Sequence, residues 1–135
     1  MLSKVSSSNP NFGWLNIDTE SKAIVKRLKG NYKDLDRIKA LVFANSSNPI
    51  EVEILPEFID STRKLRAIFT VTDKMQNMGY KGCNVKEGFF EQYTNPVNFI
   101  ERMANKATKM YNEYQAASKF KEALEGINKK NIRKI

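Results

Sequence analysis

The sequence contains no histidine and a single cysteine, Cys83, among its 135 residues. Histidine is the usual general base of enzymes and, together with cysteine, the usual ligand of zinc. Neither a Ser-His or Cys-His catalytic pair nor a structural zinc site can therefore form within the chain. We expect a non-enzymatic protein that holds no metal and no cofactor. Catalysis by a lysine or by a pair of carboxylates remains the alternative.

Long apolar runs are also missing. No stretch approaches the roughly 20 apolar residues of a membrane span, and the start of the chain, residues 1–10, has no apolar segment typical of a secretory signal. A lone cysteine cannot form a disulfide within the chain. We therefore expect no membrane association and a reducing location, either the cytoplasm or a virion or phage particle.

What the sequence does have is positive charge. Lys and Arg number 23 against 15 Asp and Glu, which gives a net charge of +8 and indicates a polyanionic partner. Two sets of cations follow helical spacing, and a third set lies near the C-terminus. The candidate nucleic-acid-binding cations are Lys22, Lys26 and Lys29, then Arg102, Lys106 and Lys109, and finally Lys129, Lys130, Arg133 and Lys134.

Like charges at helical spacing repel each other by a few tenths of a kcal/mol per pair. Contact with phosphates offsets that cost, because it releases condensed counterions. The alternative is a solvated helix face without a ligand. A further dense set, Arg63, Lys64 and Arg66, is expected instead to form ion pairs with Glu51, Glu53 and Glu57.

Four aromatic residues, Tyr80, Phe89, Phe90 and Tyr93, lie in a glycine-containing segment. Exposed aromatic rings among lysines can stack single-stranded bases, whereas buried rings belong to the core. We expect Phe89 and Phe90 to be core residues. Tyr80 is the one aromatic residue that we carry as a candidate for nucleic-acid binding.

Residues 1–13 are polar and are expected to form a mobile arm ahead of a single domain, 14–127. At the start of this domain the sequence predicts two helices. Asp18 or Thr19 can cap a first helix that runs to about Lys29, and a second helix is expected from about 31 to 44. Residues 45–49 should form a loop.

The middle of the chain is ambiguous. Residues 50–54 alternate between apolar and charged side chains, which favours a short strand. Apolar positions between 57 and 78 fit a helix, but residues 65–72 also alternate and are rich in β-formers. We favour the helix, with a small antiparallel sheet as the alternative. Residues 79–96 are expected to form a loop with one helical turn near 89–93.

The strongest structural signal is a long C-terminal helix. Asn95 can cap it, Pro96 suits its first turn, and apolar residues recur at three- and four-residue spacing from Ile100 to Leu124. Gly126 is expected to end the helix before a basic tail, 128–135. The fold class predicted is mainly α, a small helical domain with this long helix and a possible short β element, and α+β is the alternative.

The function that these patterns favour is nucleic-acid binding without catalysis, through phosphate contacts from the basic helix faces and the tail. No sequence feature selects DNA over RNA. The alternative is a structural or assembly subunit of a virion, phage or ribonucleoprotein complex. In that case the helix of residues 100–124 would be the interface for self-association or for a partner protein.

Overall fold

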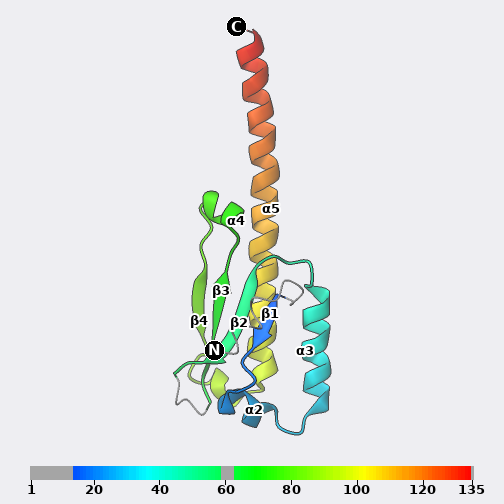
Figure 1. Ribbon diagram of the computed structural model, residues 1–135, viewed down its shortest axis with the longest axis vertical. Coiled ribbons are helices and arrows are strands. Elements are labelled where there is room, and N and C mark those ends of the chain that lie inside the picture. The colour runs from blue at the N-terminus through cyan, green and yellow to red at the C-terminus, as the bar shows by residue number, and fades with distance from the viewer. Residues whose placement is uncertain (1–13, 59–62, 135) are drawn as a thin grey trace.

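The computed structural model describes residues 14–58 and 63–134, and the side chains of 14–58 and 63–128. The predicted arm of residues 1–13 lies outside these ranges. The chain contains both strands and helices (Figure 1). In order they are β1 (Leu15–Ile17), α2 (Lys22–Leu28), α3 (Tyr32–Ala44), β2 (Glu51–Pro56), β3 (Leu65–Thr70), α4 (Asp73–Asn77), β4 (Cys83–Lys86), the 3-10 turn η1 (Glu91–Tyr93) and α5 (Pro96–Lys134).

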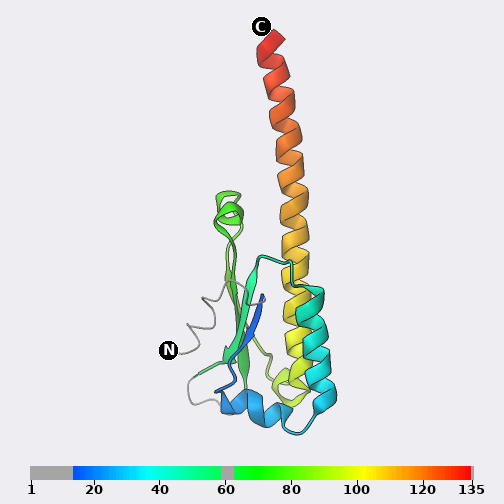
Figure 2. The same cartoon turned by 45° about the vertical axis from the view of Figure 1, so that its right-hand side comes forward.

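The four strands form one mixed sheet in the order β1-β2-β3-β4, in which β1 is parallel to β2 and the other pairs are antiparallel. Figure 2 shows α3 and the first half of α5 side by side against one face of this sheet, and α2 at its end. The fold class is therefore α+β. The α+β alternative is confirmed, and so is the long C-terminal helix; the four-stranded sheet is larger than the short β element that the mainly α prediction allowed.

The core lies between the sheet and α5. Alternate residues of β2, Val52 and Ile54, are buried beneath the helix, as the period-two pattern predicted. From α5, Phe99, Ile100 and Met103 fill the space above them and are fully buried. The alternation of the strand and the helical spacing of α5 thus meet in one apolar layer.

The predicted helix over 57–78 does not form. Its centre is β3, where Leu65, Ala67 and Phe69 are buried and the residues between them are less so. β3 hydrogen-bonds to β2 on one side and to β4 on the other. Pairing with two neighbouring strands and the β-branched residues of this segment favour a strand over the helix that its apolar spacing predicted, because strand stability depends on cross-strand neighbours. Among the described residues of this range, only Asp73–Asn77 is helical, in α4.

Two short strands were missed by the sequence reasoning. β1 is three residues long and β4 is four, and β4 crosses the segment that was expected to be a loop. In β4, Cys83 and Val85 are only partly buried, so the alternation is weak. The predicted helical turn near 89–93 is confirmed as η1, Glu91–Tyr93.

Most of the residues that cap the helices could be recognised in the sequence. Asn31 caps α3 by accepting a hydrogen bond from the Asp34 amide, and α3 spans the predicted residues. α2 begins later than expected, because Ser21 caps it through the amide of Ile24. Gly30 follows α2 with a φ of 75°, a conformation that glycine adopts without strain.

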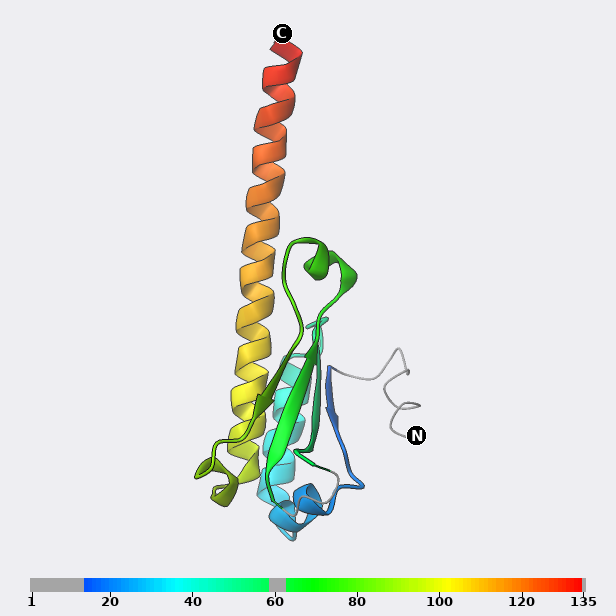
Figure 3. The same cartoon turned by 90° about the vertical axis from the view of Figure 1, so that its left-hand side faces the viewer.

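α5 begins as predicted, with Asn95 accepting a hydrogen bond from the amide of Val97 and Pro96 in the first turn. It does not end at Gly126 but continues to Lys134, 39 residues in all. At 1.5 Å per residue its length is about 58 Å, far more than the sheet needs. Its second half extends past the rest of the molecule (Figures 1 and 3).

Two glycines allow a paired test of this fold. A Cβ at Gly82, just before β4, would collide with the backbone oxygen of Phe69 in β3, whereas a Cβ at Gly126 meets nothing within 4 Å. We expect Gly82→Ala to lower the free energy of unfolding by about 1–3 kcal/mol. Gly126→Ala should raise it by up to about 1 kcal/mol, because alanine favours the helix. Urea unfolding of both variants measures this, and equal effects would contradict the strand pairing.

Candidate nucleic-acid interface

The first set of predicted cations lies at one end of the molecule. Lys22 and Lys26 belong to α2, and Lys29 is its C-cap; all three side chains are exposed. The opposite side of α2 buries Ala23 and Ile24 against the core. Within the described part of the chain, none of the three lysines is paired with a carboxylate. They therefore form a free basic edge beside Arg27.

Arg27 also belongs to α2, but its charge is used inside the protein. Its side chain is 2% exposed and that of Glu87 is 0% exposed. The two groups form a bidentate pair, in which Nη1 donates to Oε1 and Nη2 donates to Oε2 at 2.9 Å. Such a planar, double contact suits arginine and carboxylate, and it compensates part of the cost of burying both charges.

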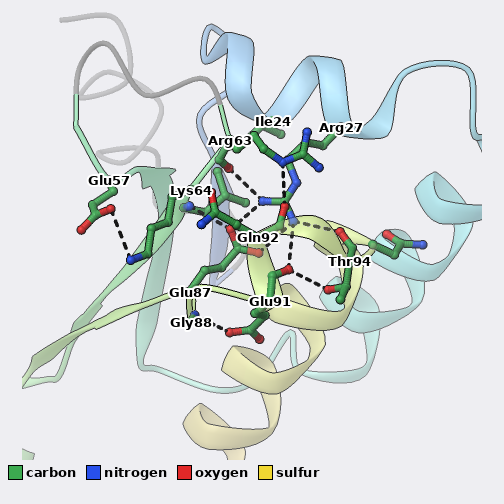
Figure 4. Close-up of polar contacts among 12 residues, drawn as sticks. Ile24, Arg27, Glu57, Arg63, Lys64, Glu87, Gly88, Glu91, Gln92 and Thr94 are labelled. Atoms are coloured by element: carbon green, nitrogen blue, oxygen red, sulfur yellow. Dashed lines mark hydrogen bonds and ion pairs between the residues drawn. The ribbon is translucent and has the colours of Figure 1, made fainter.

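The same pair ties together segments that are far apart in the sequence. Arg27 donates further hydrogen bonds to the backbone oxygens of Arg63, at 2.8 Å, and Thr94, at 2.9 Å. Glu87 accepts the backbone N–H of Leu65 at 2.9 Å. Figure 4 shows these groups converging between α2 and the start of α5. The pair thereby joins α2 to β3 and to the segment that precedes α5.

The segment between β4 and α5 is held by local hydrogen bonds as well. Glu91 accepts the amide N–H of Gly88 at 2.9 Å, and its backbone oxygen accepts the Thr94 hydroxyl at 2.7 Å. Arg102 of α5 forms a fork with the Glu91 carboxylate, with contacts of 2.8 and 3.1 Å. Burial raises the pKa of Glu91, but the bonds from Arg102 and Gly88 outweigh it and lower the pKa below 4.5.

This fixed segment displays three aromatic side chains to solvent. Phe89 is 64% exposed, Phe90 82% and Tyr93 61%. Phe89 contacts the other two rings edge to face, with centroid distances of 5.2 Å to Phe90 and 6.1 Å to Tyr93. The expectation that Phe89 and Phe90 are core residues is wrong. The two rings have no apolar surface to cover them in the described part of the chain.

Tyr80, the aromatic candidate of the sequence analysis, lies elsewhere. It follows α4 and packs edge to face on Tyr114 of α5, 5.8 Å between centroids, and it is only partly exposed. Its ring therefore helps to hold the tip of the β3–β4 hairpin against α5. The exposed rings of Phe89, Phe90 and Tyr93 offer bases a far more accessible surface.

Within the ranges described, Arg63 does not form the ion pair that was predicted for it. Of the expected ion pairs, the one between Lys64 and Glu57 forms, at 3.8 Å. Arg66 instead donates a hydrogen bond to the side-chain oxygen of Asn84, at 3.4 Å. Arg63 instead donates from Nε to the backbone oxygen of Gln92 at 3.0 Å (Figure 4). Its guanidinium lies 4.9 Å from the centre of the Tyr93 ring. Among the described residues no carboxylate neutralises it.

Arg63 also lines a polar pocket between α2, α3 and the start of α5, with a volume of about 680 Å³. The lining residues are Lys26, Arg27, Asn31, Asp34, Arg63, Thr94, Asn95 and Pro96. The charge of Arg27 is balanced by Glu87. Asp34 accepts the side-chain amide of Asn95 at 3.0 Å and lies 3.8 Å from Arg37. Two cations, Lys26 and Arg63, are therefore set against a single carboxylate, that of Asp34, and the net charge of the pocket is positive.

The second set of predicted cations lies along α5. Arg102 is already paired with Glu91 and lies over the Phe99 ring, and Lys106 lies 5.9 Å from the centre of the Phe69 ring. Lys109 is exposed. In the described ranges, Lys106 and Lys109 form no ion pair with a carboxylate. Arg102 would have to break its ion pair with Glu91 to bind a phosphate.

The structure does not bring all predicted cations into one site. The backbone of Lys129, Lys130, Arg133 and Lys134 belongs to the last turns of α5. At 1.5 Å per residue these turns lie on the order of 50 Å from the start of the helix, where α2 is found (Figure 1). A ligand that reaches both ends must be an extended polymer.

In the described ranges there is no group of three or more acidic or cysteine side chains that could hold a metal ion. Within the same ranges no helix combines the length and the apolar character needed to cross a membrane. No family model matches the chain, and neither curated proteins nor solved structures match it.

The buried pair can be tested against an exposed ion pair that also contains a glutamate. Glu87→Gln leaves the Arg27 charge buried without its counter-charge, so we expect the free energy of unfolding to fall by about 3–5 kcal/mol. Glu125, paired with Lys121 at 3.2 Å on exposed α5, is the control. Glu125→Gln should cost less than about 1 kcal/mol. Urea unfolding compares them, and similar losses would contradict the central role of the pair.

Proposed function

We propose that this protein binds nucleic acid without catalysing a reaction, and that α2 and the pocket beside it make the main phosphate contacts. The observation that carries the proposal is the pair of cations around that pocket. Lys26 and Arg63 line it together, and no carboxylate of the described residues forms an ion pair with either. A phosphodiester carries one negative charge and fits such a polar, net-positive recess.

The surroundings of the pocket support the same proposal. Lys22 and Lys29 extend the basic edge along α2, and the whole chain carries a net charge of +8. Lys106 and Lys109, and the basic residues that end α5, offer further contacts along an extended ligand. Phosphate contacts of this kind position a polymer without reading its sequence, so we expect binding with little sequence specificity.

Two charge-reversal variants, each with three substitutions, test where the phosphate contacts lie. We expect Lys22→Glu, Lys26→Glu and Lys29→Glu together to weaken binding to a labelled oligonucleotide at least tenfold at low salt. The slope of log affinity against log salt should become shallower by roughly 2–3, since up to three phosphate contacts are lost. Fluorescence anisotropy across a salt series measures both values.

The matched control reverses three exposed lysines on three other elements, Lys39, Lys74 and Lys119. Its net charge equals that of the first variant, so the comparison separates position from overall charge. We expect its salt slope to stay close to that of the unmodified protein. An equal loss in both variants would show that only the total charge matters and would refute the assignment to α2.

The projecting half of α5 favours a second candidate function, an assembly subunit. The buried residues of the predicted seam end at Ala107, and packing against the protein's own body covers the first half of the helix. Beyond it, Phe120, Leu124 and Ile127 lie on one face and are 66%, 46% and 56% exposed. Most of the stability of a helix in a protein comes from packing of its apolar face rather than from helix propensity. A partner helix on this apolar face would stabilise it.

Light scattering in high salt tests this candidate. An assembly subunit should give a defined oligomer that persists at high ionic strength, and Phe120→Ser with Leu124→Ser should return it to the monomer. Lys119→Ser with Glu122→Ser, on the other side of the same helix segment, is the control and should leave the mass unchanged. A monomeric unmodified protein at high concentration would refute the candidate.

A further inference from the structure

We infer that the ligand is single-stranded, and that the rings of Phe90 and Tyr93 stack its bases while Lys26 and Arg63 hold the adjoining phosphate. The inference rests on the proposed function and adds to it the class of nucleic acid. It concerns one end of the molecule, where η1, α2 and the start of α5 meet (Figure 4).

Arg63 links the two parts of this site. The same guanidinium lies over the Tyr93 ring, 4.9 Å from its centre, and lines the pocket that also contains Lys26. Thr94, the residue that follows Tyr93, is part of the pocket wall as well. A base on the aromatic surface and a phosphate in the pocket are therefore neighbours, as they are within one stretch of a nucleic-acid strand.

The exposed rings select for single strands. In a duplex the faces of the bases are covered by one another, so a protein contacts mainly its phosphates and base edges. An unpaired strand offers every base face for stacking on an aromatic ring, and arginine planes contribute in the same way. Three rings exposed by 61% to 82% lie beside the Arg63 guanidinium, which no carboxylate of the described residues neutralises, and this arrangement matches that second case.

The site is also held in its binding conformation before a ligand arrives. Glu87 is anchored in the interior by Arg27, and Glu91 is bonded to both Gly88 and Arg102. The amide N–H of Tyr93 donates to the backbone oxygen of Phe90 at 3.1 Å. Binding to a preorganised surface loses less conformational entropy than binding to a flexible loop. Arg27 and Glu87 are thus positioning residues for the rings.

The test compares a labelled 12-nucleotide oligo-dT, the corresponding oligo-U and a 12-base-pair duplex at the same ionic strength. We expect both single strands to bind more tightly than the duplex. Phe90→Ala with Tyr93→Ala should weaken single-strand binding by at least about 5-fold, the lower limit for losing one stacked base, and leave duplex binding unchanged. The salt slope should stay the same, because no phosphate contact is removed.

Two further variants make the comparison specific. Phe43 of α3 is 83% exposed, so Phe43→Ala removes an equally accessible ring and should change nothing. Arg63→Met removes one phosphate contact and should make the single-strand salt slope shallower by about 0.7. Urea unfolding of the Phe90 and Tyr93 double variant verifies its fold, which we expect to be intact because both rings are exposed.

The outcomes separate this inference from the proposed function. Equal affinity for single strands and duplex, with no effect of the ring substitutions, would overturn the inference while the α2 contacts stand. A change of oligomeric mass instead of affinity in the ring variant would also overturn it, since the rings would then be a protein contact. Failure to bind any of the three probes at low salt would overturn both.

Discussion

The buried pair of Arg27 and Glu87 is the interaction on which the rest of this structure depends. It joins α2 to β3 through Leu65 and Arg63, and to the start of α5 through Thr94. Burying two charges is costly, and only their double contact and the additional backbone bonds compensate for it. Because that geometry requires every partner in place, the pair fixes how the sheet, α2 and α5 meet.

The same constraint explains why polar and aromatic groups gather at this end of the molecule. With Arg27 neutralised inside, Lys26 and Arg63 are the cations of the pocket that no carboxylate of the described residues pairs with. With Glu87 anchored, the turn that follows carries Phe89, Phe90 and Tyr93 outward. Structure and proposed function are therefore linked through this one buried contact, since it holds in place the segments that carry the exposed cations and rings.

α5 has two parts that lie in different surroundings. From Pro96 to about Ala107 it is a core helix, since its apolar residues are buried against the sheet. Beyond the sheet it continues as a projecting helix whose residues 119–128 are all exposed. The sheet and α3 pack against the first half, and this packing distinguishes it from the second half. A binding or assembly role for the second half would use an apolar face that the fold leaves uncovered.

The elements with strong local signals could be predicted from the residues alone: α3 with its Asn31 cap, and the start of α5 at Asn95 and Pro96. The alternation of β2 and the net positive charge were equally evident. Features that depend on distant partners could not be predicted in this way. β3 became a strand because two neighbours pair with it, and Arg63 joined Tyr93 and the pocket because Arg27 and Glu87 hold those segments together. Local spacing encodes a helix cap, but residues 36 or 60 positions apart meet only after the chain has folded.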